Sequence, residues 1–303
     1  MTEPVHPDAL EMLRAAGLEV TEAAELAPEA AAEALAAAEI VLVRTRPLPE
    51  ALMAGPVRMI AKHGTGVDNI PLAAARAAGV VLANTPGANA AAVAEHTLML
   101  MLALAKRLPA ARAMAATGRR EGPELEAADL AGRRILIIGL GAIGRRVAAL
   151  AAAFGMEVTV LARSVSGART PEGYRIAESL AGALPMADVL SLHCPLSPET
   201  KGMIGAAEIA LLPEGAIVLN TARGGLIDEA ALAAARHLGG IGLDATEVEP
   251  LPADHPLQGR DDVILTPHTG AMSAGAFRQM GMEAARNILD HLDGRLDPAR
   301  RVV

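Results

Sequence analysis

Three segments in the second half of the sequence place polar side chains directly after runs that are typical of buried strands. They are residues 220–228, 242–250 and 265–270, which contain Arg223, Asp244, Glu247, Glu249 and His268. Open α/β sheets bind their ligands outside the carboxyl ends of the strands. We therefore expect these charged and titratable groups to gather around a bound ligand.

A fourth segment has the glycine spacing of a dinucleotide-binding turn. An apolar run leads into Gly139, Gly141 and Gly144, and a helical pattern follows. The first glycine permits the tight turn, the second lets a pyrophosphate approach the backbone, and the third lets the helix pack on the strand. The helix N-terminus, with Ala142 and Ile143, would bind the phosphates. A glycine-rich turn without a ligand is the alternative, but the strand before it and the helix after it favour a nucleotide.

The end of the next predicted strand favours NADP over NAD as the cofactor. NAD enzymes usually place Asp or Glu about 20 residues after the first glycine, where it binds the ribose 2′-hydroxyl. Ala162 occupies that place here, and Arg163 and Ser164 follow it. An arginine can bind a 2′-phosphate, and the serine adds a donor. If Arg163 is instead a solvated loop charge, NAD remains possible.

Strand and helix patterns alternate along the whole chain. Short β-branched runs predict strands at residues 40–43, 59–61, 80–82, 135–138, 158–161, 189–192, 216–219, 240–243 and 263–265. Helices are predicted at residues 71–78, 90–108, 142–153 and 274–292, with a short one after Pro47. This alternation predicts an α/β fold with parallel sheets and helices on both faces. The pattern restarts near residue 134, which predicts two units.

Composition excludes several classes of protein. Of the 303 residues, 52% are hydrophobic and 20% are charged, which is typical of a globular chain rather than a disordered one. The formal net charge is −8 and no dense Lys/Arg run offsets it, so we expect neither a nucleic-acid nor a membrane partner. The apolar stretch at residues 90–108 carries charged residues near both ends, which favours a buried helix over a membrane span.

The cysteine and histidine content argues against disulfides and metals. Cys194 is the only cysteine, so no intrachain disulfide can form, and a reducing, cytoplasmic location fits. No His/Cys/Asp/Glu cluster has the spacing of a metal site, and we expect none.

Taken together, these segments resemble the D-isomer-specific 2-hydroxyacid dehydrogenases, the family of phosphoglycerate dehydrogenase and glyoxylate/hydroxypyruvate reductase. The resemblance also includes residues 62–70, 84–89, 93–96 and 192–196, and it covers nearly the whole chain. It implies two Rossmann-like/flavodoxin-like domains with the active site between them, and a homodimer. A nucleotide domain, residues 98–274, would be inserted into a substrate domain, residues 1–97 and 275–303.

The resemblance implies a catalytic triad. His268 would be the general acid that protonates the carbonyl oxygen of a 2-keto acid as hydride arrives, and histidine titrates near the working pH. Glu249 would hydrogen-bond His268 and favour its protonated form. It is preferred to Glu247 because it lies five residues after Asp244 and directly before a proline, as in the family motif. Arg223 would clamp the substrate carboxylate in a bidentate contact that lysine makes poorly.

Further ligands are implied on the same basis. Asp244 would bind the nicotinamide carboxamide, and the backbone N–H groups of Thr65 and Gly66 would help hold the substrate carboxylate. Additional cofactor contacts are expected at His193, Cys194, Pro195, Thr221 and Ala222. His193 and His96 are interpreted as packing near the cofactor or between the domains. His6, His63, His237, His255 and His291 receive no catalytic role.

Three features depart from the family pattern. In the family, a segment like residues 1–10 usually follows a short apolar strand, which is absent here. Either the translation start is placed too late or the first domain lacks a strand. Residues 118–120 stand where relatives often carry a tryptophan near the dimer arm. The chain also stops at Val303, without the regulatory domains of some phosphoglycerate dehydrogenases, so feedback control of that type is not expected.

Three functions remain open on the sequence. The leading one is reduction of a small 2-keto acid, such as glyoxylate or hydroxypyruvate, to the D-2-hydroxy acid. The second is oxidation of D-3-phosphoglycerate, whose phosphate would need the cations Arg44 and Arg46. The third is a dinucleotide-sensing binding protein, which would not need Arg223, Glu249 and His268 together. Formate oxidation is disfavoured because that branch has glutamine in place of the glutamate before the proline.

Overall fold

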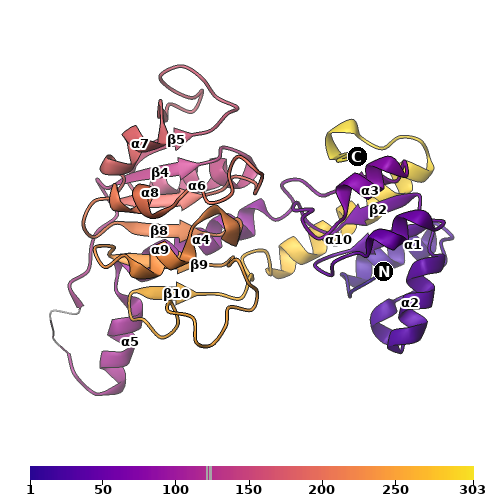
Figure 1. The fold of residues 1–303 in the computed structure, drawn as a ribbon, viewed down its shortest axis with the longest axis horizontal. Coiled ribbons are helices and arrows are strands. Elements are labelled where there is room, and N and C mark those ends of the chain that lie inside the picture. The colour runs from indigo at the N-terminus through magenta and orange to yellow at the C-terminus, as the bar shows by residue number, and fades with distance from the viewer. Residues whose placement is uncertain (121, 123–124) are drawn as a thin grey trace. The chain divides into compact units, whose positions relative to one another are not determined.

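The computed structural model describes residues 1–120, 122 and 125–303, and the chain divides into two compact units (Figure 1). The first unit comprises Met1–Asn89 and Ala271–Val303, and the second comprises Ala90–Gly270. The sequence-based boundary between residues 97 and 98 falls inside helix α4 (Ala90–Ala105). That helix packs on α6 and on strands β8 and β9, so it belongs to the second unit from its first residue.

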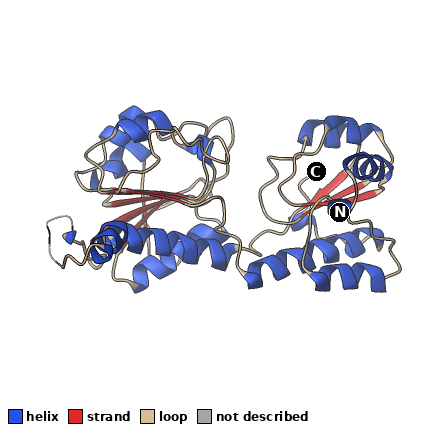
Figure 2. Cartoon of the chain, turned by 90° about the horizontal axis from the view of Figure 1, so that it is seen from below, coloured by secondary structure: helices blue, strands red, loops and turns tan. Residues whose placement is uncertain are grey.

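The second unit is built on a seven-stranded sheet of order β10-β9-β8-β7-β4-β5-β6, in which every pair is parallel. The strands are β4 (Arg134–Ile138), β5 (Glu157–Leu161), β6 (Arg175–Ile176), β7 (Val189–Leu192), β8 (Ile217–Asn220), β9 (Gly240–Leu243) and β10 (Val263–Leu265). Its helices are α4, α5 (Leu108–Ala116), α6 (Ala142–Ala153), α7 (Leu180–Ala183), α8 (Ala206–Ala210) and α9 (Glu229–Ala234). Figure 2 shows helices on both faces of this sheet, as the alternating pattern predicts.

Close packing of α4 on the sheet depends on glycines in β9. A Cβ atom at Gly242 would lie 2.8 Å from Leu219 Cδ2 and 3.3 Å from Leu100 Cβ, and one at Gly240 would lie 3.0 Å from Leu104 Cδ2. Most of α4 is buried, which explains why it is apolar on nearly every side. No helix of the described residues is long and apolar enough to cross a bilayer.

The first unit contains a three-stranded parallel sheet of order β1-β2-β3. Its strands are β1 (Ile40–Val43), β2 (Met59–Lys62) and β3 (Val81–Ala83), and its helices are α1 (Pro7–Ala15), α2 (Pro28–Ala37), α3 (Leu72–Ala77) and α10 (Ala274–Leu292). Ser273 caps α10 by accepting the N–H of Ala276 at 3.1 Å. A Cβ at Gly281 would lie 3.3 Å from Ala9 Cβ, so the glycine lets α10 pack closely on α1.

The α/β class with parallel sheets is confirmed. The long apolar helix ends earlier than predicted, one short strand was missed, and helices α1, α2, α7, α8 and α9 were not among the predicted ones. The predicted helix at residues 90–108 ends at Ala105, because Arg107 adopts φ 52° and a new helix, α5, begins at Leu108. The two-residue strand β6 was missed because it is too short to show a period. Among the described residues none before β1 lies in a strand, and Thr2 N–H donates to the Leu42 carbonyl at 3.1 Å.

Candidate active site

The candidate site lies at one edge of the second unit's sheet. Because all seven strands are parallel, their carboxyl ends meet at that edge. The glycine turn follows β4, Arg163 follows β5, His193 follows β7, Arg223 follows β8, Asp244 follows β9 and His268 follows β10. Strand order reverses beside β4, which has β5 on one side and β7 on the other. Open α/β sheets bind dinucleotides at such a switch point.

The glycine turn has the space that a pyrophosphate needs. Gly139 has φ 96°, and a Cβ there would lie 2.6 Å from the carbonyl of His193. A Cβ at Gly144 would lie 2.0 Å from the carbonyl oxygen of Gly139, so only glycine fits. At Gly141, by contrast, a Cβ would meet no atom within 4 Å, and no side chain caps the start of α6. An anion can therefore approach the backbone N–H groups of this turn.

His193 lies behind the glycine turn. Its Nε2 is 2.8 Å from Ser191 Oγ, and its buried Nδ1 has no hydrogen-bond partner among the described residues. Burial lowers the pKa of His193 to about 3, so the ring is neutral at physiological pH. A buried nitrogen without a partner is costly, and a bound group beside the turn would satisfy it. The residues present thus fit a dinucleotide.

The end of β5 carries a cation but no acid. Ala162 occupies the place of the usual ribose-binding acid, and Arg163 and Ser164 after it are exposed. Within the described chain Arg163 forms no hydrogen bond or ion pair, although it acts electrostatically on Cys194 and Glu199. Burial raises the pKa of the Cys194 thiol, whose sulfur lies 3.8 Å from that of Met203.

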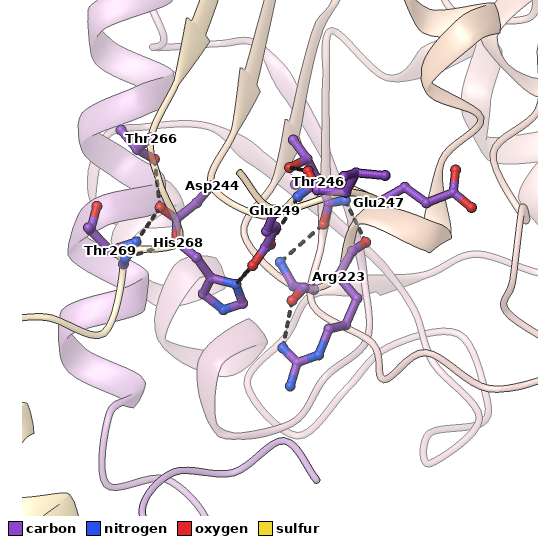
Figure 3. Close-up of polar contacts among 12 residues, drawn as sticks. Arg223, Asp244, Thr246, Glu247, Glu249, Thr266, His268 and Thr269 are labelled. Carbon is purple, nitrogen blue, oxygen red and sulfur yellow. Dashed lines mark hydrogen bonds and ion pairs between the residues drawn. The ribbon is translucent and has the colours of Figure 1, made fainter. Parts of the chain in front are cut away.

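The structure brings His268 and Glu249 together. His268 Nδ1 lies 2.9 Å from both carboxylate oxygens of Glu249, and the two side chains are 43% and 42% exposed (Figure 3). The hydrogen bond to Glu249 raises the pKa of His268, although burial and the nearby Arg223 oppose the shift. Burial alone would raise the pKa of Glu249, but the bond to His268 lowers it. His268 Nε2 forms no hydrogen bond with any described residue, so it can face a substrate.

Arg223 is held in place by its own loop. Asn220, which ends β8 and is buried, donates to the Arg223 carbonyl at 2.7 Å and accepts the Ala222 N–H at 3.0 Å. The guanidinium donates to the Ala222 carbonyl at 2.7 Å. Figure 3 shows the Arg223 and His268 side chains extending toward the same side of the loops, whereas Glu247 points away. The cation and the imidazole can therefore act on one small anion.

Asp244 binds the turn that carries His268. One carboxylate oxygen accepts bonds from Thr266 Oγ1 at 2.6 Å and the Thr269 N–H at 2.8 Å, and the other accepts the Gly270 N–H at 2.8 Å (Figure 3). Burial alone would raise the pKa of Asp244, but these bonds and His96 lower it to about 2. The Asp244 carbonyl also accepts the His268 N–H at 2.9 Å, where His268 has φ 54°. This fixes a backbone conformation that is uncommon outside glycine.

This network was not visible in the sequence. His96 Nε2 lies 2.9 Å from Thr266 Oγ1, and because that hydroxyl donates to Asp244, His96 must donate to it. His96 therefore carries its proton on Nε2. Segments containing His96, Thr266 and Asp244 were identified, but only the fold brings α4 beside the turn after β10.

The remaining residues that were predicted to contact the cofactor follow strands β7 and β8. Thr221 is buried and its hydroxyl pairs with that of Thr97 on α4 at 2.9 Å. Ala222 lies in the Arg223 loop, and Cys194 and Pro195 follow His193 at the end of β7. Among the described residues, no three His, Cys, Asp or Glu side chains are grouped so that they could hold a metal ion.

The predicted substrate ligands Thr65, Gly66 and Arg44 lie in the first unit. The loop after β2 is held by Thr85, whose hydroxyl accepts the Gly64 N–H at 3.0 Å. Backbone N–H groups of Thr65 and Gly66 have no acceptor in the part of the chain that the structure describes, so they can receive an anion. The Arg44 guanidinium lies 5.0 Å from the ring centre of Phe277 and donates to the Pro4 carbonyl at 2.9 Å.

The strand order and the glycine turn define the second unit as a Rossmann-type dinucleotide-binding fold. Residues 98–270 match the sequence model of the D-isomer specific 2-hydroxyacid dehydrogenase, NAD binding domain. Because that match covers more than half of the chain, the chain belongs to the D-isomer specific 2-hydroxyacid dehydrogenase family.

Individual relatives agree with the family assignment. A D-3-phosphoglycerate dehydrogenase of Methanocaldococcus jannaschii is 37% identical over 98% of this chain, but the chain spans only 57% of that relative's length. A hydroxypyruvate reductase of Thermotoga maritima is 37% identical over 84% of this chain and 85% of its own length. The crystal structure of the TT0316 protein from Thermus thermophilus covers 100% of this chain and 98% of its own, at 37% identity and a TM-score of 0.89.

Proposed function

We propose that this chain reduces a small 2-keto acid of the glyoxylate or hydroxypyruvate type to the D-2-hydroxy acid, with NADPH as the favoured cofactor. The observation that carries the proposal is the His268–Glu249 pair beside Arg223. An imidazole that is held more basic than usual can protonate a carbonyl oxygen, and a guanidinium can bind the adjacent carboxylate. Similarity to a hydroxypyruvate reductase over most of both chains supports this substrate class.

Each residue of the site has a distinct task in this reaction. The glycine turn at Gly139, Gly141 and Gly144 would hold a nicotinamide dinucleotide, which when bound would supply hydride for C2 of the keto acid. His268 delivers a proton from Nε2 to the carbonyl oxygen, while Glu249 on Nδ1 stabilises the imidazolium before transfer and orients the ring. Arg223 binds the substrate carboxylate and polarises the carbonyl. Thr65, Gly66 and Arg44 stay predicted substrate ligands, and Asp244 stays the predicted contact of the nicotinamide carboxamide.

The first test is reduction of hydroxypyruvate, glyoxylate and phenylpyruvate with NADPH and NADH in parallel, followed by nicotinamide absorbance. We expect turnover of at least one keto acid, with a preference for NADPH. Turnover with a preference for NADH would contradict the cofactor proposal while leaving the reaction intact. Absence of turnover together with tight cofactor binding would contradict the reductase and favour a dinucleotide-sensing protein.

The preference for NADPH is proposed to depend on Arg163. Its exposed side chain follows Ala162, forms no hydrogen bond or ion pair with the described residues, and can pair with a 2′-phosphate. We expect Arg163→Ala to lower the NADPH/NADH ratio of kcat/KM by roughly tenfold, because a charged hydrogen bond is worth about 1.5–3 kcal/mol. The matched control is Arg169→Ala, an exposed arginine on the same loop that donates to the Gly173 carbonyl. An equal loss in both variants would contradict a specific role for Arg163.

Oxidation of D-3-phosphoglycerate is the second candidate function. The name of the Methanocaldococcus jannaschii relative and the cations Arg44 and Arg46 at the end of β1 favour it. Arg44 already contacts the Pro4 carbonyl and the Phe277 ring, which leaves fewer donors for a phosphate. Oxidation of D-3-phosphoglycerate with a higher kcat/KM than that of D-glycerate would make this function the better one.

We also propose a cytoplasmic homodimer. Support for the dimer comes from apolar side chains on α4 and α5, where Met99 is 46% exposed and Leu108 is 56% exposed. Light scattering during size-exclusion chromatography tests the dimer, and a mass of about 31 kDa, that of one chain, would contradict it.

A further inference from the structure

We propose that Glu229 is a positioning residue, aided by His255, that holds the loop of Glu249 and thereby keeps Glu249 on His268. This inference rests on the proposed function in one respect only, namely that the His268–Glu249 pair transfers a proton. Among the described residues, no hydrogen bond or ion pair joins Glu229 or His255 to His268.

The loop of residues 246–249 is held by a buried carboxylate. Glu229, the first residue of α9, is 8% exposed, and its Oε1 accepts the backbone N–H of Glu247 at 2.6 Å. This bond has a charged acceptor and is short, so it is stronger than an ordinary backbone bond. The neighbouring N–H, that of Thr246, is accepted by Glu249 itself at 3.2 Å. Two carboxylates therefore bind two successive peptide groups of one loop.

A glycine lets the loop lie directly on the segment of Arg223. A Cβ atom at Gly224 would lie 1.9 Å from the carbonyl carbon of Thr246 and 2.1 Å from the nitrogen of Glu247. The peptide group that Glu229 binds is thus the same one that packs on Gly224. Because Gly224 directly follows Arg223, a shift of this peptide would change the position of Glu249 relative to both His268 and Arg223.

His255 is oriented to stabilise the charge of Glu229. The Leu257 N–H donates to His255 Nδ1 at 3.3 Å, so Nδ1 is an acceptor and the proton of the neutral ring lies on Nε2. That Nε2 is 3.9 Å from Glu229 Oε2. Burial raises the pKa of Glu229, and the charges of Glu247 and Glu249 raise it further, while the Glu247 N–H and His255 oppose them. His255 therefore favours the ionised form that binds the loop.

The test follows the pKa of His268 by NMR titration of its ring proton, assigned with His268→Gln. We expect Glu229→Ala to lower the His268 pKa toward its ordinary value, because Glu249 is no longer held on Nδ1. Glu229→Gln keeps an oxygen acceptor for the Glu247 N–H and should restore most of the wild-type pKa. Glu247→Gln, which changes the exposed glutamate of the same loop, is the matched control and should leave it unchanged.

Activity and stability separate a positioning role from a structural one. In Glu229→Ala we expect kcat for keto-acid reduction to fall by about tenfold, a fraction of what a general acid supplies, with little change in the NADPH Kd. If Glu229→Ala does not fold, His255→Gln replaces it and should lower the His268 pKa by a smaller amount. An unchanged His268 pKa beside a lower melting temperature would overturn the proposal. A shifted His268 pKa in an enzyme that reduces no keto acid would overturn only the proposed function.

Discussion

Two of the carboxylate–histidine pairs in the second unit, Glu249–His268 and Glu229–His255, differ in exposure, in separation and in the direction in which the pKa of the glutamate is shifted. The side chains of Glu249 and His268 are nearly half exposed and 2.9 Å apart. Those of Glu229 and His255 are mostly covered and 3.9 Å apart. The exposed pair has a raised histidine pKa and a lowered carboxyl pKa. In the covered pair it is the carboxyl whose pKa is raised.

The comparison teaches that the same residue type, glutamate, acquires opposite pKa shifts in different environments. His268 Nδ1 is bonded to Glu249, and its Nε2 forms no hydrogen bond with any described residue. Nε2 can therefore donate a proton to a substrate. Glu229 instead uses an oxygen to bind a backbone N–H, and a covered group of that kind orders the chain. We infer that the exposed pair, His268 and Glu249, transfers the proton. The covered pair, Glu229 and His255, holds the loop of Glu249 in position.

The largest expected effect comes from removing the exposed histidine. His268→Ala deletes the proposed general acid, and we expect kcat for keto-acid reduction to fall by roughly 10²–10⁴-fold. The cofactor site at the glycine turn should be intact, so titration of cofactor fluorescence should give a Kd close to that of the wild type. Loss of cofactor binding would mean that His268 is structural.

A smaller effect is expected at the neighbouring cation. Arg223→Lys keeps the charge but loses the bidentate fork, and we expect kcat/KM to fall by roughly 10–100-fold, since a charged hydrogen bond contributes about 1.5–3 kcal/mol. Steady-state kinetics with a keto acid measures the change. The same assay with Arg169→Lys provides the control, and equal activities of wild type and Arg223→Lys would show that the fork does not matter.

Gly224→Ala tests the packing of the loop that Glu229 holds. The new methyl would overlap the Thr246–Glu247 peptide, which lies about 2 Å away. We expect the free energy of unfolding to fall by about 1–3 kcal/mol, as for overpacked cores, and kcat to fall as well. Chemical denaturation measures the first quantity. Gly225→Ala is the matched control and should destabilise the protein less, because its Cβ would meet only side-chain carbons of Leu196, at 3.3 Å and beyond.

The smallest effect is expected for the other glutamate of the loop. The Glu247 side chain is exposed and points away from His268. Among the described residues, only its backbone N–H forms a hydrogen bond, which Glu229 accepts. Glu247→Gln should therefore change the free energy of unfolding by less than about 0.5 kcal/mol and leave kcat unaltered. A loss of activity comparable to that of a Glu249 variant would reverse the choice between the two glutamates.

Much of the fold was predictable because the strands are short, apolar and separated by strong helix patterns. Helices α6 and α10 have the predicted bounds, since each begins beside a clear signal, a glycine turn in one case and Ser273 in the other. The break after Ala105 was missed because Arg107 carries no sequence signal for its left-handed conformation. Polar groups at strand ends were predictable in kind because parallel strands share one ligand-binding edge.

The supporting contacts were not predictable. In the sequence, Glu229 looks like an ordinary acidic residue in the first turn of a helix, and His255 looks like a loop histidine. The residues around them give no sign that Glu229 contacts the loop of Glu247 or that His255 lies near Glu229. The same holds for His96, whose bond to Thr266 joins residues 170 positions apart. Sequence spacing identifies the residues that contact a ligand. The residues that hold those side chains in place can be identified only once the folded structure shows which segments pack together.

We propose above all that Glu249 keeps His268 protonated for transfer to a keto acid. The most direct test is the pH dependence of kcat/KM for hydroxypyruvate reduction by NADPH in wild type and Glu249→Gln. Reduction needs protonated His268, so the rate is high below the raised pKa and falls as pH rises through it. Removing the negative partner lowers that pKa, and we predict that the falling limb moves to lower pH. A limb at the same pH in both proteins would contradict the account.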